Sequence, residues 1–367
     1  MYDYLIVGAG LFGSVCSREL SNAGKECLII DKRKHIGGNC YTENIEGINV
    51  HKYGAHIFHT SDENIWKYIN KYSGFINYIH RVKVKYKNRI YSFPINLLTL
   101  YQLWGVCDPE EAKNKIKQKQ ITIKNPHNLE DWILSQVGEE IYNIFIKGYT
   151  EKQWQRSPSE LPTSIIRRLP IRFTYNDDYF NDKFQGIPED GYTKIFNNLL
   201  KYIPVKLNTN FLDNREYFLN IAKKIIYTGK IDEYFNYVYG RLEYRSLLFK
   251  HEILDIDDYQ GISVINYPDL KIPFTRIIEH KHFEGNKDHI KKTIITREYP
   301  QLYDYTNDPY YPINDDKNNK LFDKYRRLAK KYPNLIFGGR LGEYKYYDMD
   351  EVISSALRCT ERELKHE

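Results

Sequence analysis

The sequence has few of the features that mark secreted, membrane-spanning or metal-binding proteins. Its five cysteines are scattered and none forms a CxxC pair, so we expect free thiols in a reducing cytoplasm. No window holds 18 uninterrupted apolar residues, which predicts no membrane span. The N-terminal MYDYLIVGAG lacks the basic start and the cleavage site of a signal peptide. These absences predict a cytoplasmic protein with no membrane partner.

What is present describes a globular chain of more than one domain. At 367 residues, two to three domains are expected, and 41% apolar with 28% charged residues is typical of globular proteins. The net charge of +6 comes from lysines spread along the chain, and the densest run, KNKIKQKQ at 113–120, is typical of a solvated helix face or loop. No nucleic-acid-binding motif accompanies this charge. We therefore expect no nucleic-acid partner and favour an anionic small molecule.

Residues 3–31 contain, in order, an apolar strand, a glycine turn, a helical pattern, a second apolar strand and an acid. Gly8 permits the tight turn and Gly10 lets a pyrophosphate approach the backbone. Gly13 lets the helix pack closely on the strand, and Asp31 follows the second strand where a carboxylate accepts hydrogen bonds from a ribose. This complete arrangement predicts a Rossmann-type dinucleotide-binding site.

Two further segments favour FAD over NAD. The basic, glycine-rich loop at 32–39 resembles the second segment of FAD-containing oxidases, although an ordinary turn with solvated lysines is the simpler alternative. Residues 336–358 predict a strand, a glycine turn and a helix that begins near Asp348. A helix N-terminus there would stabilise negative charge at a reduced flavin ring. Chain ends that meet at one cofactor imply that the middle of the sequence is inserted.

The motifs beyond the glycine turn resemble those of one flavoenzyme family. GAGLFG, HIGGN, YGAHIFHT, GYTEKQW, RFTYNDDYFNDKFQGIPEDGYT, EYRSL, TRIIEHKHF, PYYP and GGRLGEYKYYDM occur in this order. Their order and spacing resemble the bacterial UDP-galactopyranose mutases over nearly the whole chain. The resemblance implies an α/β fold with three domains: a Rossmann-type FAD-binding domain (1–76, 206–234 and 330–367), an inserted helical domain (95–153) and an antiparallel β-sheet substrate domain (77–94, 154–205 and 235–329).

The resemblance also implies an isomerase activity. The family interconverts UDP-galactopyranose and UDP-galactofuranose, with N5 of the reduced flavin attacking the anomeric carbon and UDP leaving. A cofactor that acts as the nucleophile fits a sequence in which we find no Ser-His-Asp set, no paired carboxylates and no metal cluster. The furanose product would supply a surface polysaccharide, and the family expectation is a homodimer.

The FAD contacts that the resemblance implies come from the glycine turn, the basic loop, the GAHIF segment and the C-terminal segment. They are Gly8, Gly10, Leu11, Phe12, Gly13, Asp31, Lys32, Gly38, Asn39, His56, Ile57, Arg340, Tyr347, Asp348 and Met349. His56 and His59 have the HxxH spacing of metal ligands, but no third ligand follows, so we expect no metal. The resemblance places His59 beside the sugar as a catalytic residue, and a buried structural histidine is the alternative.

The implied substrate contacts are aromatic residues, arginines, tyrosine hydroxyls and one asparagine. They are Phe145, Tyr149, Trp154, Arg168, Tyr179, Arg245, Asn266, Arg276, Tyr310, Tyr311 and Tyr346. The aromatic residues of a helix that continues from 129–147 would form a platform for uracil, with packing between domains as the alternative. Arg168 and Arg276 would stabilise the departing pyrophosphate as catalytic residues, and the Ser-Pro and Leu-Pro pairs before Arg168 predict a mobile segment there. Arg245 could equally hold domains together.

The sequence departs from the family pattern at three positions, where Gln155 replaces a glycine, Lys230 a proline and His80 an asparagine. Lys152 and Arg156 are expected to be solvated and to have no role. Two other functions stay open at this point. One is an FAD-dependent oxidoreductase of the amine-oxidase-like group, and the other is a non-catalytic nucleotide-sugar binding module.

Overall fold

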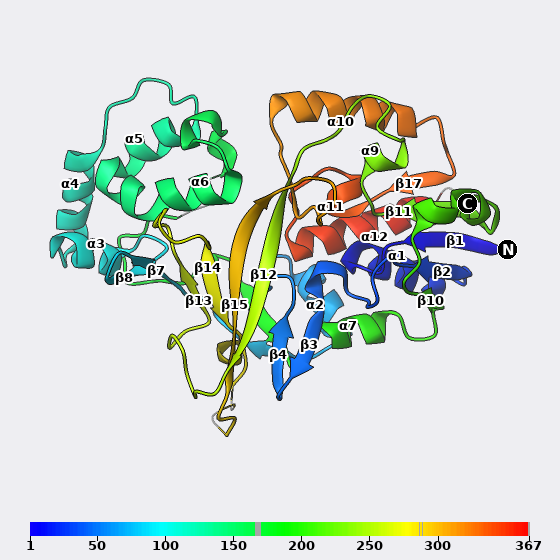
Figure 1. Cartoon of the computed structure of the whole chain (residues 1–367), viewed down its shortest axis with the longest axis horizontal. Coiled ribbons are helices and arrows are strands. Elements are labelled where there is room, and N and C mark those ends of the chain that lie inside the picture. Colours follow the sequence, from blue (N-terminus) through cyan, green and yellow to red (C-terminus); the bar gives the residue numbers. More distant parts are fainter. Residues whose placement is uncertain (166–169, 286, 288, 366–367) are drawn as a thin grey trace. The chain divides into compact units, whose positions relative to one another are not determined.

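The computed structural model describes residues 1–165, 170–285, 287 and 289–365, which form two compact units (Figure 1). Unit 1 contains Met1–Asn77, Asp182–Ser246 and Tyr303–Glu367, and unit 2 contains Tyr78–Asn181 and Leu247–Leu302. The two chain ends therefore fold together in unit 1, as the sequence predicted, and the middle of the chain forms most of unit 2. The boundaries of the three predicted domains stay a prediction.

Unit 1 is built on a parallel sheet with the strand order β10-β2-β1-β11-β17. The strands are β1 (Tyr2–Val7), β2 (Cys27–Ile30), β10 (Val205–Lys206), β11 (Ala222–Tyr227) and β17 (Leu335–Phe337). Ile6 of β1 is in register with Ile29 of β2 and with Ile226 of β11. The predicted strands at 3–7 and 27–30 are confirmed, and the sheet has the parallel pairing of a Rossmann-type fold.

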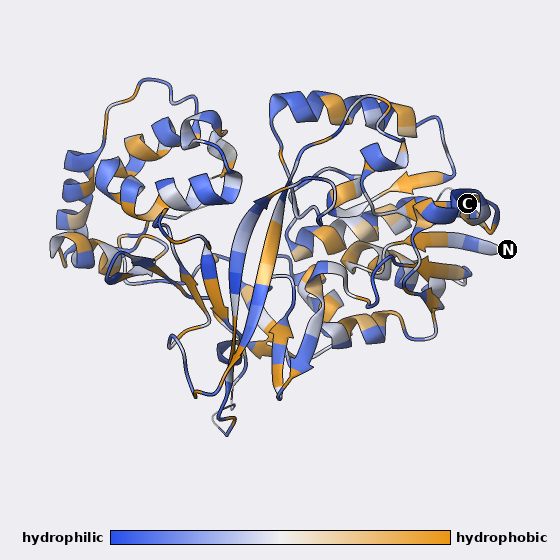
Figure 2. Ribbon diagram, in the orientation of Figure 1, coloured by the Kyte–Doolittle hydropathy of each residue, from blue (hydrophilic) through white to orange (hydrophobic). Residues whose placement is uncertain are grey.

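Alternate residues of β1 pack on opposite faces of this sheet, because successive side chains of a strand point to opposite sides. Tyr4 and Ile6 pack with α1 (Leu11–Asn22), α7 (Tyr192–Leu199) and α12 (Met349–Lys365). Leu5 packs on the other face with side chains of the short helices η5 (Phe211–Asn214), α8 (Arg215–Asn220) and α9 (Ile231–Tyr234). Figure 2 shows orange, hydrophobic stretches in these central strands, as expected for strands covered on both faces.

The remaining elements of unit 1 are two small sheets, one short strand of the larger sheet and several helices. They are β3 (Thr42–Ile45), β4 (Ile48–His51), β5 (Phe58–Thr60), β6 (Phe75–Asn77), β9 (Phe184–Pro188), β16 (Tyr311–Pro312), η1 (Gly38–Cys40), α2 (Glu63–Asn70), α10 (Asp316–Ala329) and α11 (Gly339–Gly342). β3 and β4 form an antiparallel hairpin, and β9 pairs with both β5 and β6. The elements from η1 to β6 follow β2 directly in the chain.

Most of the second large sheet belongs to unit 2. Its strand order is β16-β12-β15-β14-β13-β7-β8, and β16, with the first residues of β12 that pair with it, belongs to unit 1. Its other strands are β7 (Val82–Tyr86), β8 (Arg89–Phe93), β12 (Tyr244–Leu254), β13 (Val264–Asn266), β14 (Arg276–Glu279) and β15 (Thr293–Leu302). The pairs β7–β8, β13–β14 and β14–β15 are antiparallel, as predicted, whereas β13 and β7 pair in parallel. The short helix η6 (His280–Phe283) follows β14.

The helices of unit 2 occupy most of the segment between β8 and the second half of the chain. They are α3 (Leu97–Trp104), α4 (Pro109–Lys119), α5 (Leu129–Ile141), η2 (Tyr142–Lys147), α6 (Gly148–Trp154), η3 (Pro158–Glu160) and η4 (Thr163–Ile165). The predicted helix from 129 into the GYTEKQW segment is present but not uniform. Gly138 breaks it with φ 77° and ψ 178°, and η2 is a π-helical turn. Turns of this kind are frequent at functional sites.

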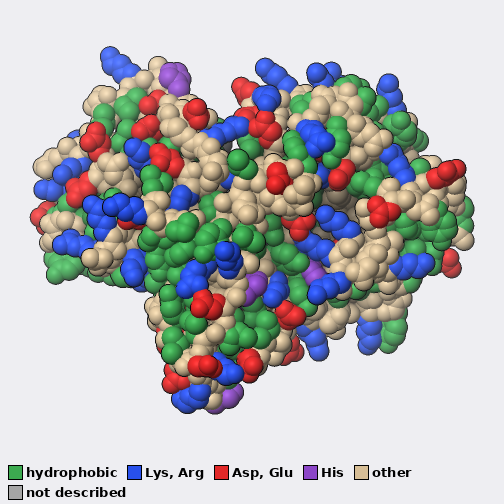
Figure 3. Space-filling model, in the orientation of Figure 1, with side chains coloured by type: hydrophobic (Ala, Val, Ile, Leu, Met, Phe, Trp, Pro, Cys, Tyr) green, Lys and Arg blue, Asp and Glu red, His purple; other side chains and the backbone are tan. Residues whose placement is uncertain are grey.

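The surface has the mixed character that the composition predicts. On the face drawn in Figure 3, lysine and arginine side chains are dispersed among acidic ones. Among the described residues, no helix is both long enough and apolar enough to cross a membrane.

Candidate active site

The glycine turn of unit 1 needs glycine at two positions for steric reasons. A Cβ on Gly8, whose φ is 113°, would lie 2.0 Å from Oγ1 of Thr228. A Cβ on Gly13 would lie 2.0 Å from the carbonyl oxygen of Gly8, so the helix packs directly on the turn. Gly10 is the N-cap of α1 and provides no side-chain cap for the first amides of the helix. Uncapped amides at a helix N-terminus suit a phosphate group.

A second loop lies against this turn. The amide of Gly37 donates to the carbonyl of Ala9 at 2.8 Å, and a Cβ on Gly38 would come within 3.0 Å of Cα of Gly10. Asp31 is buried and accepts hydrogen bonds from the amide of Ala9 at 2.7 Å and from the amide of Arg33 at 2.8 Å. Each carboxylate oxygen keeps capacity for a further donor. The backbone and Asp31 therefore suit a dinucleotide.

The basic loop is ordered by Arg33, which the sequence prediction did not include. Its guanidinium donates to Oδ1 of Asn39 at 3.0 Å and to Oδ2 of Asp308 at 2.9 Å, and it lies 4.4 Å from the ring centroid of Tyr53. Lys32 is more exposed and reaches Asp308 at 3.4 Å. The partner of Arg33 is 275 residues away, so local sequence carries no signal for this pair.

The histidines of the GAHIFHT segment differ in environment. His56 holds Nδ1 at 2.8 Å from the carbonyl of Gly54, and its amide donates to Nδ1 of His51 at 3.1 Å. Burial lowers the pKa of His56 to about 4 and that of His51 to about 3, so both imidazoles are neutral at pH 7. Ile57 is buried beside them.

His59 is oriented by a carboxylate. Nδ1 of His59 lies 2.7 Å from Oδ2 of Asp182, and Oδ1 of the same carboxylate accepts from the hydroxyl of Ser61 at 2.7 Å. A carboxylate at Nδ1 favours a proton on that nitrogen. Asp182 was absent from the predicted set, because its place beside His59 depends on the pairing of β5 with β9.

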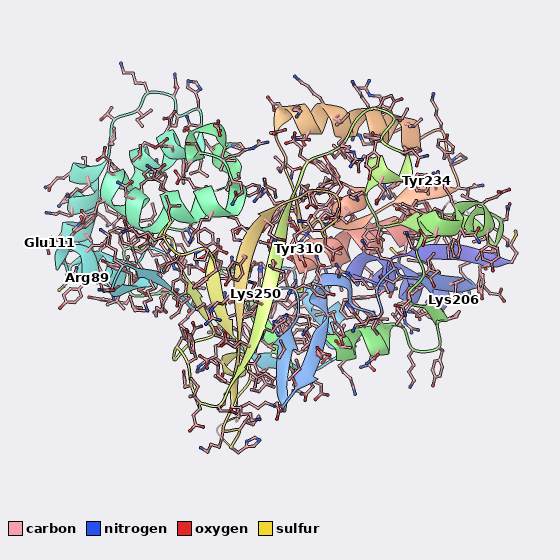
Figure 4. All side chains as sticks on the ribbon, in the orientation of Figure 1. Arg89, Glu111, Lys206, Tyr234, Lys250 and Tyr310 are labelled. Carbon is pink, nitrogen blue, oxygen red and sulfur yellow. The ribbon has the colours of Figure 1, made fainter. Side chains whose placement is uncertain are left out.

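The predicted C-terminal and tyrosine residues of unit 1 form one cluster around Arg340. Its guanidinium donates to the carbonyls of Tyr347 at 2.5 Å and Tyr310 at 3.3 Å. The rings of Tyr311 and Tyr346 stack at 5.1 Å and lie within 6 Å of the same guanidinium. Figure 4 labels Tyr310, which precedes β16.

The cluster and the C-terminal segment beside it contact other parts of unit 1. The amide of Tyr310 donates to the carbonyl of Arg245 at 2.9 Å, and Arg245 is buried. Helix α12 begins at Met349, directly after Asp348, which confirms the predicted helix start. A Cβ on Gly338 would lie 2.1 Å from the ring of Phe12, so the C-terminal glycine turn packs on α1. Leu11 and Met349 line one small apolar pocket.

In unit 2 a row of polar side chains crosses the sheet. Arg276 of β14 is directly opposite Asn266 of β13 and Glu298 of β15, so the three share one face. Nε of Arg276 lies 3.4 Å from Oε1 of Glu298, and Nη2 donates to the hydroxyl of Tyr149. Burial raises the pKa of Tyr149 to about 12, although Arg276 acts against the rise. Tyr149 therefore stays protonated at neutral pH.

Asn266 adds an unused acceptor to this row. Its side chain is 8% exposed, and no donor among the described residues hydrogen-bonds to its Oδ1. Buried polar atoms are rarely left without a partner, so each exception points to a missing water, ion or ligand. The row therefore offers a cation, a hydroxyl and a free amide oxygen on one face of the sheet.

The aromatic residues predicted to hold uracil fall into two groups. Phe145 is buried, with its ring 5.4 Å from that of Tyr91 and 6.1 Å from that of Phe93. Trp154, the last residue of α6, is half-buried and therefore accessible in part. Tyr179 is also partly exposed, and its amide donates to the carbonyl of His80 at 2.7 Å.

The expectation that Lys152 is solvated is wrong. Its side chain is 8% exposed, and its ammonium donates to four backbone carbonyls. Every acceptor lies more than 100 residues along the chain, so the helical pattern around Lys152 could not reveal them. Gln155 adopts φ 54° as the C-cap of α6, which explains why glycine is suited to that position. Arg168 lies outside the described residues.

Family models match two regions of the chain. Residues 6–72 match an NAD(P)-binding Rossmann-like domain, and residues 144–346 match the UDP-galactopyranose mutase family. The fold and these matches first define a nucleotide-binding α/β enzyme of the isomerase class. More particularly, the chain belongs to the UDP-galactopyranose mutase family.

Relatives of known name span the whole chain. It is 41% identical to a dTDP-fucopyranose mutase of Escherichia coli, over 100% of this chain and 99% of that protein. It is also 41% identical to a probable UDP-galactopyranose mutase of Klebsiella pneumoniae, over 98% and 94%, and 34% identical to the UDP-galactopyranose mutase of Mycoplasma genitalium, over 97% and 93%.

Solved structures agree on the fold. A crystal structure of reduced UDP-galactopyranose mutase matches with a TM-score of 0.76 and 14% identity, over 100% of this chain and 96% of that one. A putrescine oxidase structure matches with a TM-score of 0.56 and 12% identity, over 98% of both chains. At these identities the likeness extends to the fold alone.

Proposed function

We propose that this protein interconverts UDP-galactopyranose and UDP-galactofuranose with FAD as its cofactor, in the reduced form. The observation that carries the proposal is the row of Asn266, Arg276 and Glu298 with the hydroxyl of Tyr149. A partly buried guanidinium beside an acceptor without a donor suits a phosphate next to a polar nucleoside. An amine-oxidase-like enzyme, which binds no nucleotide sugar, would not need this row of polar side chains.

The residues of unit 1 fit a flavin dinucleotide. Gly10 and Gly38 lie close together, since a Cβ on Gly38 would come within 3.0 Å of Cα of Gly10, and the first amides of α1 have no side-chain cap. The turn shaped by Gly8 and Gly13 would receive the pyrophosphate at Gly10, and Asp31 would accept hydrogen bonds from a ribose. Lys32, Asn39, His56, Ile57, Arg340, Tyr347, Asp348 and Met349, with Leu11 and Phe12, would complete the cofactor contacts. Reduced flavin, when bound, supplies a nucleophilic nitrogen for the anomeric carbon of the sugar.

The chain's own side chains would bind and orient the substrate and stabilise its leaving group. Arg276, with Arg168 and Arg245, would neutralise the pyrophosphate charge that grows as UDP departs. The hydroxyls of Tyr310, Tyr311 and Tyr346 would donate to the same oxygens. Phe145, Tyr149, Trp154 and Tyr179 would hold the uridine together with Asn266. His59, fixed through Nδ1 by Asp182, would present Nε2 to the sugar hydroxyls.

The test is an assay of the purified protein before and after reduction with dithionite. We expect flavin absorbance in the protein as isolated, and conversion of UDP-galactofuranose to UDP-galactopyranose by the reduced protein only. A flavin-containing protein that oxidises amines and converts no nucleotide sugar would contradict the proposal, and so would a colourless protein that fails to bind added FAD. We also propose a cytoplasmic homodimer whose product supplies a surface polysaccharide, and light scattering tests the dimer.

A second substrate pair is favoured by one relative. The dTDP-fucopyranose mutase of Escherichia coli matches this chain over its full length at the same identity as the Klebsiella protein. dTDP-fucopyranose differs from UDP-galactopyranose at three places. Its base carries a methyl group at C5, its ribose lacks the 2′-hydroxyl, and its sugar lacks the 6-hydroxyl. Parallel assays with both substrates decide between them by the ratio of kcat/KM.

A further inference from the structure

Lys152 is a buried lysine with an unusual set of partners. Its ammonium donates to the carbonyl of Tyr267, and also to those of Asp269 at 3.1 Å, Ile272 at 3.0 Å and Phe274 at 2.8 Å. These acceptors form one turn, residues 267–274, which we call the carbonyl turn. An ammonium has three hydrogens and no acceptor, so it suits a concave set of carbonyl oxygens, and with four acceptors here one hydrogen is shared between two of them.

The carbonyl turn joins two candidate substrate residues. It begins directly after Asn266, the last residue of β13, and ends two residues before Arg276, the first residue of β14. The rings of Tyr267 and Phe274 pack edge-on at 4.9 Å across it. Any movement of the turn would therefore displace the amide of Asn266 or the guanidinium of Arg276.

Helix α6 lies against the same turn at a second point. A Cβ on Gly148 would come within 2.2 Å of the carbonyl oxygen of Pro268, so the helix backbone directly touches the turn. Gly148 and Lys152 are one helical turn apart and therefore share a face. Tyr149, between them in sequence, receives the hydrogen bond from Arg276. Two independent contacts thus fix α6 to the turn.

We propose that Lys152 is a positioning residue for nucleotide binding. Its ammonium fixes α6, with Tyr149 and Trp154, to the carbonyl turn, and so holds these rings in register with Asn266 and Arg276. This inference rests on the proposed function, because the aromatic residues and Arg276 are assigned to the nucleotide there. Lys152 itself touches no substrate in this scheme.

The test compares wild type with Lys152→Met, which keeps the length of the side chain and removes the donor. Lys281→Met is the matched control, because Lys281 is equally buried and donates to the carbonyls of Asp257 and Ile290, away from the carbonyl turn. UDP and dTDP are titrated against each holoenzyme by calorimetry, and kcat and KM are measured after reduction.

We expect Lys152→Met to bind the nucleotide at least tenfold more weakly and to raise KM in proportion, with kcat within about threefold of wild type and full flavin content. Lys281→Met should bind like wild type. Equal dissociation constants for wild type and Lys152→Met would overturn the inference, and so would an equal loss in both variants. A wild-type protein that binds neither nucleotide would instead contradict the proposed function.

A measurement on wild type keeps the test valid if Lys152→Met does not fold. Hydrogen–deuterium exchange is followed with and without the nucleotide that binds. If α6 and the carbonyl turn act together, the nucleotide should slow exchange in both segments. Protection of α6 with unchanged exchange in residues 267–274 would overturn the inference.

Discussion

The candidate sites of the two units depend on different kinds of contact. In unit 1 the candidate site depends on close packing at glycines: a Cβ would lie 2.0 Å from the carbonyl oxygen of Gly8 if placed on Gly13, within 3.0 Å of Cα of Gly10 if placed on Gly38, and 2.1 Å from the ring of Phe12 if placed on Gly338. In unit 2 the site depends on charged side chains, with Arg276 and Lys152 held by groups from distant segments. A site of the first kind is intolerant of added volume. A site of the second kind is intolerant of lost charge.

The largest expected effect comes from adding volume in unit 1. Gly10→Val should fold, because a Cβ there meets only Cα of Gly38, at 3.7 Å, but it should retain no flavin, since the side chain would occupy the place of the pyrophosphate. Gly13→Val should fold poorly, because its Cβ would lie 2.0 Å from a backbone oxygen.

Flavin absorbance and circular dichroism separate these two outcomes. Gly285→Val is the matched control, because a side chain there meets no described atom within 4 Å. It should keep both flavin and fold. Stoichiometric flavin in folded Gly10→Val would mean that the cofactor binds elsewhere.

The second expected effect comes from removing charge in unit 2. Arg276→Ala should lower kcat/KM at least a thousandfold, which corresponds to about 4 kcal/mol of lost transition-state stabilisation, while flavin stays bound. Arg297→Ala removes an arginine from the opposite face of the same sheet, where it pairs with Glu252. This control should retain nearly normal activity. Near-normal kcat/KM in Arg276→Ala would disprove its catalytic role.

The same contrast explains how much could be predicted from the sequence. Gly8, Gly13 and Asp31 lie within one strand–helix–strand unit, so local spacing was enough to predict the strands, which the structure confirms, and to propose a dinucleotide site there. The row on the sheet of unit 2 depends on the register of β13, β14 and β15, which no local pattern gives. The resemblance to a family supplied Asn266 and Arg276 instead. Glu298, Asp182 and the buried ammonium of Lys152 were missed, because burial of a charge depends on its long-range partners.

A smaller effect is expected at the end of α6. Trp154→Ala should weaken binding of UDP about tenfold, or about 1.4 kcal/mol, without loss of flavin, because the ring is half-buried and available for stacking. Calorimetry on wild type and variant measures this directly. Trp104 lies on α3 with its indole nitrogen 2.9 Å from Glu140, and Trp104→Ala is the control. Equal dissociation constants for wild type and Trp154→Ala would assign Trp154 to packing.

The smallest expected effects are changes in the free energy of unfolding with pH. The histidines of unit 1 and of unit 2 should change it in opposite directions. In unit 1 burial lowers the pKa of His51 to about 3 and of His56 to about 4. Below about pH 6.5 the two histidines bind protons in the unfolded chain but stay neutral in the folded chain. They therefore lower the free energy of unfolding of unit 1 as the pH falls. The urea midpoint should therefore drop between pH 7 and pH 5, and drop less in His51→Gln.

In unit 2 the nearby carboxylate of Glu279 raises the pKa of His282 above 6.5, with Nε2 of His282 3.4 Å from Glu279 and 3.1 Å from Asp258. The folded chain binds this proton more tightly than the unfolded chain. The stabilisation is therefore complete below about pH 6.5 and is lost as the pH rises through the raised pKa. His282→Gln should cost most stability near pH 6 and least near pH 9, measured by urea unfolding. A cost that grows with pH would mean that His282 is neutral in the folded protein, and the contrast between the two units would then fail at this residue.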